Sequence, residues 1–302
     1  MATNEAAFNP HLANAAMYRM EHNRYLGDSI AVVCEVSPED IANNGLTGNI
    51  IATYIKTACD TAAVPSLQSL GSAELFDKER PLPLRIASSC ELGVFGDMHC
   101  DCEDDRQASL RAISKNGQGV FVQLPQEALG HGLIYKAREL ELQVHGVLPD
   151  GTYVGPKDIF EAAAALGVSS SFDQRGFRIV GKLFDTLGIN RYDYTLITGN
   201  SEKAQAMAEV TGLAIVGHMA LASTITIDNI GVYLAKIQYG TPLAAADLGK
   251  VLEVLRSGAT LPRRTIALIE KFGETVRGDL GARHAEQLQA VVAAYDSASY
   301  SD

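Results

Sequence analysis

The sequence lacks the features that mark secreted and membrane-spanning chains. No apolar run approaches the roughly 20 residues that a membrane-spanning helix needs. The first five residues contain no basic stretch followed by an apolar core, so we expect no secretory signal. Only five of the 302 residues are cysteine, and two of these, Cys34 and Cys59, lie in apolar runs typical of core thiols. The composition therefore indicates a cytoplasmic protein without a disulfide framework.

Positive charge is also scarce. The 25 Lys and Arg residues stand against 36 Asp and Glu residues, which gives a formal net charge of −11. Such a field repels polyanions, so we expect neither nucleic acid nor a membrane surface as a partner. A small anionic substrate is still compatible with this charge, because a few local cations can dominate a pocket. The hydrophobic content of 47% suffices for one large or two small domains.

From about residue 84 onward, short apolar runs typical of buried strands alternate with periodic runs typical of helices. The expected strands are 84–88, 119–124, 194–197 and 213–216. The expected helices between and around them are 104–116, 132–144, 156–166, 178–187 and 201–210. This alternation predicts an α/β (α+β layered) fold, with a mixed β-sheet flanked by helices.

The two ends of the chain have different patterns. Ser37 followed by Pro38 indicates the start of a helix, and the segment 49–59 could be either helix or strand. From residue 242 on, the pattern is helical throughout. The charged, proline-containing segment 77–83 is the best candidate boundary. We therefore expect an N-terminal extension, a core and a helical C-terminal segment, over residues 1–80, 81–241 and 242–302.

Three cysteines fall close together, at Cys90, Cys100 and Cys102. Three thiolates without an obvious fourth protein ligand are typical of a catalytic zinc site, which keeps one position open for water. The alternative is three unrelated free thiols, but the residues around them are Asp, Glu, His and Gly rather than apolar side chains. His99 could replace one of the cysteines as a ligand. The cluster therefore predicts a bound zinc ion.

Five sequence blocks resemble, in order, the core of the GTP cyclohydrolase II family. They are Arg85 to Cys90, Cys100 to Cys102, Gly119 to Glu127, Asp173 to Phe177, and Leu196 to Lys203. The similarity covers about residues 84–218, and five blocks in order are more specific than any single block. The resemblance implies one zinc ion per chain, a core like that of this family with a helical C-terminal extension, and a homodimer.

The resemblance also assigns roles to individual residues. In that family zinc assists the hydrolytic opening of the guanine ring, a ring carbon leaves as formate, and an arginine attacks the α-phosphorus with loss of diphosphate. Carried over, the three cysteines are the zinc ligands, Asp173 carries protons, and Arg175 is the nucleophile or stabilises phosphate charge. A surface ion pair is the alternative for these last two residues. The implied substrate-binding residues are Arg85, Glu127, Thr198 and Lys203, of which Glu127 could instead be a solvated loop charge.

The chain departs from the family pattern near the base and the polyphosphate. The arginine of the family's loop falls on Leu129, its catalytic tyrosine on Leu140, and a glutamine near the base on Asp105. His131, between two glycines, or Tyr135 on the following helix could replace the tyrosine as an acid or base. For His131, an ordinary polar loop residue is an equal alternative.

These observations predict a zinc-dependent cyclohydrolase that opens the base ring of a small-molecule nucleotide. A pyrimidine (uracil) nucleotide such as UMP fits the altered positions better than GTP, as in the uracil-catabolism branch that resembles this family. A genuine GTP cyclohydrolase II, which forms formate, diphosphate and a diaminopyrimidine in the riboflavin pathway, is the first alternative. The second is a zinc-stabilised nucleotide-binding pseudoenzyme, which the joint presence of Asp173, Arg175 and Lys203 argues against.

Overall fold

The computed structural model describes residues 12–95, 100–157, 159–168, 173–198, 201–221, 224–238, 243, 245–277 and 285–299. The chain forms two compact units, each assembled from separate stretches of sequence. The first unit comprises 1–90, 105–132 and 173–221, and the second comprises 91–104, 133–172 and 222–302. Both contain buried hydrophobic clusters of their own. The three-part division of the sequence into 1–80, 81–241 and 242–302 stays a prediction.

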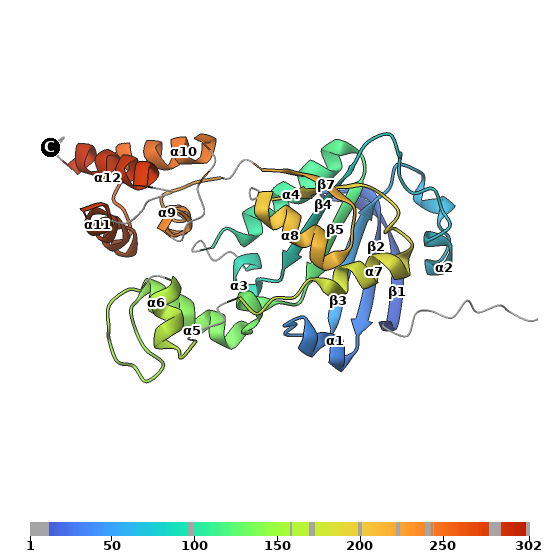
Figure 1. The fold of residues 1–302 in the computed structure, drawn as a ribbon, viewed down its shortest axis with the longest axis horizontal. Coiled ribbons are helices and arrows are strands. Elements are labelled where there is room, and N and C mark those ends of the chain that lie inside the picture. The colour runs from blue at the N-terminus through green and yellow to red at the C-terminus, as the bar shows by residue number, and fades with distance from the viewer. Residues whose placement is uncertain are drawn as a thin grey trace, which may run out of the picture. The chain divides into compact units, whose positions relative to one another are not determined.

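The first unit is built on a seven-stranded sheet with the order β1-β2-β3-β5-β4-β6-β7 (Figure 1). The strands are β1 (Leu12–Asn23), β2 (Gly27–Val36), β3 (Ile50–Lys56), β4 (Leu82–Ser88), β5 (Gly119–Leu124), β6 (Tyr194–Ile197) and β7 (Ile215–Met219). The pairs from β1 to β5 are antiparallel, whereas β5, β4, β6 and β7 run parallel. The predicted α/β fold with a mixed sheet is confirmed.

Three of these strands lie in the N-terminal region, where the pattern of apolar residues is weak. The segment 49–59, which could have been helix or strand, contains the strand β3. In it Ile51, Thr53 and Ile55 are fully buried and alternate with more exposed residues, as is typical of a strand. β1 escaped prediction because its twelve residues include no Val, Ile or Thr. The N-terminal region therefore supplies almost half of the sheet rather than a peripheral segment.

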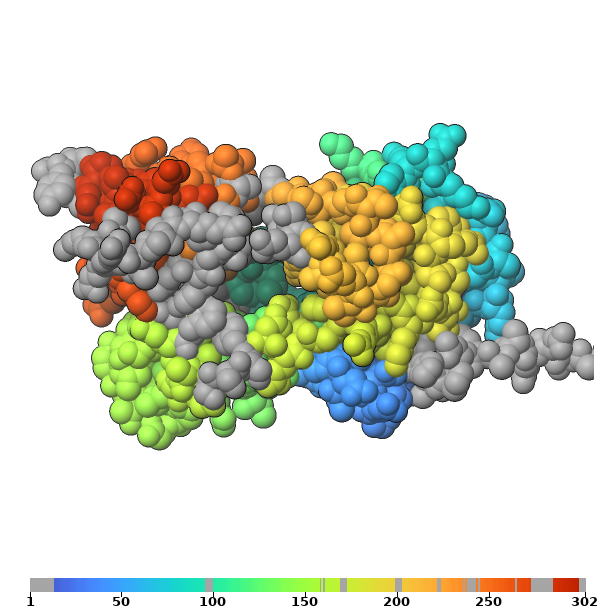
Figure 2. All heavy atoms as spheres, viewed as in Figure 1, coloured from blue at the N-terminus to red at the C-terminus, as the bar shows by residue number. Residues whose placement is uncertain are grey.

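Helices cover both faces of this sheet. Val120, Val122 and Leu124 of β5 contribute to the larger core, together with α7 (Arg178–Leu187) and α8 (Ser201–Thr211). Phe121 of the same strand points to the other face, where α4 (Cys102–Asn116) contributes to a smaller cluster. In the space-filling view, α7 and α8 form a continuous surface in front of the strands (Figure 2).

Short elements complete the first unit. They are α1 (Pro38–Asn43), α2 (Leu67–Leu70) and the 3₁₀ turns Thr61–Ala63 and Glu127–Gly130. α1 begins as predicted, since the side chain of Ser37 accepts a hydrogen bond from the backbone N–H of Asp40. α7 ends at Gly188, whose φ of +66° is the left-handed conformation that favours glycine.

The second unit is helical in its C-terminal part. Its helices are α3 (Glu91–Val94), α5 (Leu133–Val144), α6 (Ile159–Ala165), α9 (Ile230–Gln238), α10 (Ala245–Arg256), α11 (Arg263–Arg277) and α12 (Ala285–Ser299). Tyr233, Val251, Phe272 and Val291 belong to one core formed by the last four helices. The helical C-terminal segment is confirmed, although α9 was not predicted. Among the helices described, none has both the length and the apolar character that a membrane crossing requires.

The contact between α7 and α8 predicts a stability effect at Gly181. A Cβ atom at this position would lie 2.1 Å from the carbonyl oxygen of Thr211, and backbone cannot give way as a flexible side chain can. We expect Gly181→Ala to lower the free energy of unfolding by about 1–3 kcal/mol despite the better helix propensity of alanine. Urea denaturation measures this. Gly217→Ala, where a Cβ meets no atom within 4 Å, is the matched control, and equal effects would contradict the packing argument.

Candidate functional site

The topology of the sheet creates a natural site at the carboxyl ends of its parallel strands. The chain passes from β4 to β5 on one side of β4, and later returns to β6 on the other side. In open α/β sheets, ligands bind outside the carboxyl ends of the strands at the point where the strand order reverses. Here that point lies between β4 and β6. Most of the site residues predicted from the sequence follow β4, β5 or β6.

Arg85 bridges this reversal point from within β4. Its Nη1 atom donates to the carbonyl oxygen of Ile197 at the end of β6 (3.0 Å), and its Nη2 atom lies 3.2 Å from Oδ2 of Asp105 in α4. The side chain is 18% exposed. Its Nε atom is buried and has no hydrogen-bond partner among the described residues. A buried donor of this kind has an unused position for an acceptor supplied by a ligand.

Asp173 and Arg175 form a tight pair just before α7. The Nε and Nη2 atoms of Arg175 donate to the two carboxylate oxygens of Asp173 at 2.8 and 2.5 Å, a bidentate arrangement. The Nη1 atom of Arg175 also donates to Oγ of Ser88, which ends β4 (3.3 Å). Burial acts to raise the pKa of Asp173, but the hydrogen bonds and charge of Arg175, with the charge of Lys203, outweigh it and lower the pKa. Asp173 is therefore ionised at neutral pH.

Lys203, in the first turn of α8, belongs to the same cluster. Its pKa is lowered to about 8, first by burial and then by the positive charges of Arg85 and Arg175, while Asp173 and Asp105 act in the opposite direction. Three cations and two carboxylates thus influence one another directly at this edge of the sheet. Close cations without a full complement of anions are the arrangement expected of an anion-binding site.

Thr198 lies where β6 ends, next to this cluster in sequence. Its side chain is buried, and its backbone N–H donates to the carbonyl oxygen of Met219 (2.9 Å). The turn between Thr198 and α8 includes Gly199 and Asn200, which lie outside the described residues. The predicted phosphate turn is therefore described only at its two ends.

The loop after β5 has an unusual backbone. Ala128 and Leu129 have φ values of +51° and +59°, a left-handed conformation that costs non-glycine residues roughly 1–2 kcal/mol each. Glu127 is buried rather than solvated, and its backbone N–H donates to Oγ1 of Thr47 (3.2 Å). The backbone N–H of His131 donates to the carbonyl oxygen of Ala128 and closes the turn (3.1 Å). The surrounding contacts hold this loop in a conformation that its own residues disfavour.

The three cysteines predicted as metal ligands are brought together. The Sγ atoms of Cys90, Cys100 and Cys102 all lie within 4.8 Å of one another. Tetrahedral ligands with metal–sulfur bonds of about 2.3 Å lie about 3.8 Å apart, so a small contraction would let all three hold one ion. His99 lies outside the described residues. Cys34 is a buried core thiol as predicted, and burial raises its pKa to about 11.

Tyr135 belongs to the second unit, on α5. Burial, followed by the charge of Glu139, raises the pKa of its phenol to about 12. At neutral pH the phenol therefore keeps its proton and can act as a donor. Leu140, at the position of the family's tyrosine, is buried within the same helix.

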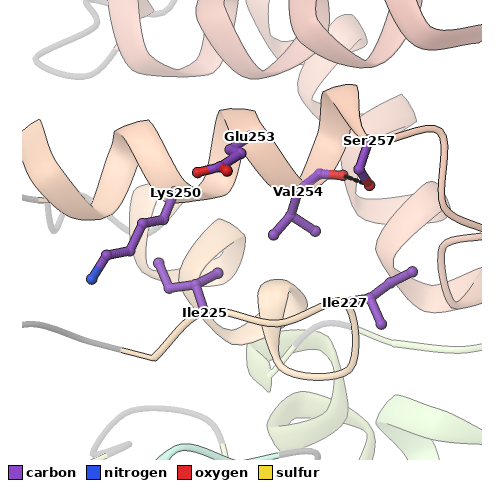
Figure 3. A pocket seen from close by; sticks show the side chains of 6 residues that line it. All are labelled: Ile225, Ile227, Lys250, Glu253, Val254 and Ser257. Carbon is purple, nitrogen blue, oxygen red and sulfur yellow. Dashed lines mark hydrogen bonds between the residues drawn. The ribbon is translucent and has the colours of Figure 1, made fainter.

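The second unit also contains a separate hollow between α10 and the segment preceding α9 (Figure 3). Its lining residues are Ile225, Ile227, Lys250, Glu253, Val254 and Ser257. No cysteine, histidine or predicted site residue is among them. This hollow therefore adds nothing to the chemistry of the site described above.

Asp105 and Ser88 are two members of the cluster that the sequence did not identify. The sequence alone does not show that Asp105 on α4 lies against Arg85 on β4, because the two residues are 20 positions apart. Ser88 lay within a matching block but received no role. The mismatch at Asp105, where the family has glutamine, was the one signal that could have found it.

A family model described as GTP cyclohydrolase II matches residues 61–220, which is more than half of the chain. The chain belongs to the GTP cyclohydrolase II family. The family consists of hydrolases that act on carbon–nitrogen bonds, so the predicted class of enzyme is confirmed at that level. The matched region includes all eleven residues predicted for the site.

Individual relatives agree with the family model. A GTP cyclohydrolase-2 of Pasteurella multocida is 35% identical over 149 residues, which cover 49% of this chain and 61% of that protein. One from Neisseria meningitidis serogroup C is 33% identical over 155 residues, covering 51% and 71%. A riboflavin biosynthesis protein RibBA of Phocaeicola vulgatus is 32% identical over 145 residues, covering 48% and 32%. The chain thus spans less than two thirds of the first of these relatives and only a third of the last.

The lowered pKa of Lys203 predicts how stability depends on pH. An unfolded lysine titrates near 10.4, so between about pH 8 and 10 the unfolded chain binds more protons at this position than the native protein does. The contribution of Lys203 to the free energy of unfolding therefore rises with pH between about pH 8 and 10. Relative to Lys203→Met, the wild type should gain stability from pH 8 to 10, by at most about 1.4 kcal/mol per pH unit. Urea denaturation at each pH measures this, and parallel curves for the two proteins would contradict it.

Proposed function

We propose that this chain is a zinc-dependent cyclohydrolase that opens the base ring of a nucleotide, with a uracil nucleotide such as UMP preferred over GTP. The observation that carries the proposal is a cluster of three cysteine thiols in a chain of the GTP cyclohydrolase II family. The overall reaction adds water across a ring carbon–nitrogen bond. The carbon gains the oxygen, the nitrogen gains the proton, and no oxidant is needed.

The donor set of the cysteine cluster fits zinc. Three thiolates leave one tetrahedral position for water or substrate, the pattern of a catalytic rather than a structural site. When bound, zinc would lower the pKa of a water molecule and polarise the group under attack. Cys90, Cys100 and Cys102 would hold the ion.

The cluster around Arg85 would bind the phosphate of the nucleotide. The unpaired Nε of Arg85, the guanidinium of Arg175 and the ammonium of Lys203 provide donors with positive charge at the reversal point of the sheet. Thr198 would add a buried hydroxyl at the end of β6. Glu127 would contact the base, as the resemblance implies.

The charge of this cluster favours a single phosphate. The three cations are balanced by Asp105 and Asp173, which leaves one net positive charge. A phosphate monoester carries nearly two negative charges at neutral pH, whereas a triphosphate carries about four. Leu129 supplies no charge where the family has arginine, and Asp105 neutralises Arg85 where the family has a neutral glutamine. Both differences reduce the affinity expected for a polyphosphate.

Proton transfer would fall to Asp173, with His131 or Tyr135 as a second group. Asp173 is ionised and lies against Arg175, so it can accept a proton while the guanidinium stabilises negative charge. With a monophosphate no diphosphate leaves, and Arg175 acts by its charge rather than as a nucleophile. A homodimer and a cytoplasmic location are also parts of this proposal.

Removal of a cysteine tests the metal. We expect about one zinc per wild-type chain by elemental analysis, and loss of zinc and of turnover in Cys100→Ser. The affinity should fall by more than the 10–100-fold that is typical when only an outer hydrogen-bond partner of a ligand is removed. Cys59→Ser, a half-buried thiol outside the cluster, is the control and should keep its zinc. Full zinc occupancy and activity in Cys100→Ser would contradict the proposal.

A substrate panel tests the reaction. The purified protein is incubated with UMP, UTP, uridine and GTP, and loss of the base absorbance is followed. We expect the highest kcat/KM for UMP, with at least a tenfold loss for uridine because the phosphate contacts are missing. Mass spectrometry should show a product that retains the phosphate of the substrate.

GTP is the second candidate substrate, because two of the relatives are GTP cyclohydrolase-2 enzymes. In that case the panel would show GTP consumed fastest, with formate and diphosphate released in step with ring opening. Such a result would overturn the uracil assignment and leave the cyclohydrolase assignment intact. No turnover of any member of the panel by zinc-loaded protein would overturn both.

A further inference from the structure

Three backbone N–H groups in a row, at and around Arg175, donate hydrogen bonds. The N–H of Gln174 donates to the carbonyl oxygen of Leu129 (3.0 Å), and the N–H of Arg175 donates to Oδ1 of Asp173 (3.1 Å). The N–H of Gly176 donates to the carbonyl oxygen of Asn44 (2.8 Å). Two of these three consecutive amides are therefore held by distant parts of the chain, and the third by the neighbouring side chain of Asp173.

One buried side chain connects these partners. Gln126 is fully buried, and its Nε2 atom donates to the carbonyl oxygens of Asn44 (2.8 Å) and Gly176 (2.7 Å). Its Oε1 atom lies 3.4 Å from Oγ of Ser88, and the same Oγ accepts a hydrogen bond from Arg175. Gln126 thus contacts the backbone beside Arg175 and, through Ser88, its guanidinium.

The packing leaves little freedom for this arrangement to shift. A Cβ atom on Gly45 would lie 2.1 Å from the carbonyl oxygen of Gln174, and one on Gly176 would lie 2.8 Å from Cα of Asn44. The side chain of Asn44 is buried and accepts a hydrogen bond from the backbone N–H of Ile179 (3.1 Å). It thereby caps the first turn of α7, which has no cap of its own. Asn44 and Gly45 lie outside the region that the family model matches.

We infer that Gln126 is a positioning residue for Arg175. Its amide is the one buried side chain described here that donates to both the Asn44 turn and the Asp173–Phe177 segment. The Gln126 amide therefore determines the position of the Arg175 guanidinium relative to the carboxyl ends of β4 and β6. A displacement of about 1 Å in such a group can cost roughly 100-fold in rate.

Two buried glutamines at opposite ends of β5 provide a matched comparison. Gln118, just before β5, is also almost fully buried, and its side chain joins the backbone N–H and carbonyl groups of Asp77. Both are replaced by methionine, which keeps the length of the side chain and removes its hydrogen bonds. Hydrogen exchange of residues 174–177 is measured in each variant, together with zinc content, urea stability, kcat and KM.

We expect Gln126→Met to speed exchange of the amides of residues 174–177 at least tenfold and to lower kcat about 10–100-fold, with a smaller change in KM. Gln118→Met should lose comparable stability but keep wild-type exchange in this segment and wild-type kcat. Unchanged exchange in Gln126→Met, or an equal loss of kcat in both variants, would overturn the inference.

Gln126→Glu adds a readout that a purely structural role would not move. A carboxylate cannot donate to the two carbonyl groups, whereas a protonated carboxyl can donate to one of them. The kcat of Gln126→Glu relative to wild type should therefore rise as the pH falls, while the ratio for Gln126→Met stays flat. A kcat ratio to wild type that does not change with pH in either variant would overturn the inference. If Gln126→Met does not fold, both hydrogen exchange and the pH dependence of kcat are measured on Gln126→Glu.

The kinetic part of this test rests on the proposed function, but the exchange part does not. If the wild type turns over no member of the substrate panel, the cyclohydrolase assignment is wrong and kcat cannot be compared. If GTP is the substrate, kcat is compared with GTP. The exchange comparison between Gln126→Met and Gln118→Met still decides whether Gln126 holds the segment that carries Arg175.

Discussion

The mutual repulsion of three cations at one edge of the sheet is the constraint on which the site depends. Arg85, Arg175 and Lys203 all contribute to the electrostatics of this edge. Burial is the largest cause that lowers the pKa of Lys203 to about 8, and the charges of the two arginines lower it further. An arrangement of this kind is stable only if anions and fixed backbone oppose the repulsion. Asp105 and Asp173 supply the anions, and the carbonyl oxygen of Ile197 fixes one guanidinium. The same repulsion would be relieved by a bound anion, which is why the proposed function assigns the phosphate of the substrate to this edge.

The backbone on which Arg175 stands is fixed by segments far apart in the sequence. The turn at Asn44, the loop at Leu129 and the segment before α7 exchange hydrogen bonds, and the amide of Gln126 joins them. The left-handed conformations of Ala128 and Leu129 are retained because these contacts outweigh their local cost. The turn at Asn44, which precedes β3, therefore supports the backbone that carries Arg175, although this turn contains no predicted catalytic residue.

Sequence patterns predicted the central strands well, because β5 and β6 are buried on both faces and read as continuous apolar runs. They missed β1, whose exposed edge position tolerates a composition without β-branched residues. The cysteine cluster was predictable because its members are close in sequence and chemically specific. The pairing of Arg85 with Asp105 and the role of Gln126 were not, since both depend on which side chains the fold brings together across 20 to 80 positions.

Two of the positions at which the chain departs from the family pattern implied by the resemblance change the charge near the Arg85 cluster. By the resemblance, Leu129 stands where the family has an arginine, which removes one positive charge, and Asp105 stands where it has a neutral glutamine, which adds a negative one. Asp105 forms an ion pair with Arg85, with Oδ2 lying 3.2 Å from Nη2 of the guanidinium. This contact restricts the position of the Arg85 side chain. A guanidinium held in this way still offers its Nε atom, but it contributes less net charge to a bound anion. Under the proposed function, two differences acting in the same direction, around a cluster with one net positive charge, would favour a single phosphate over a polyphosphate.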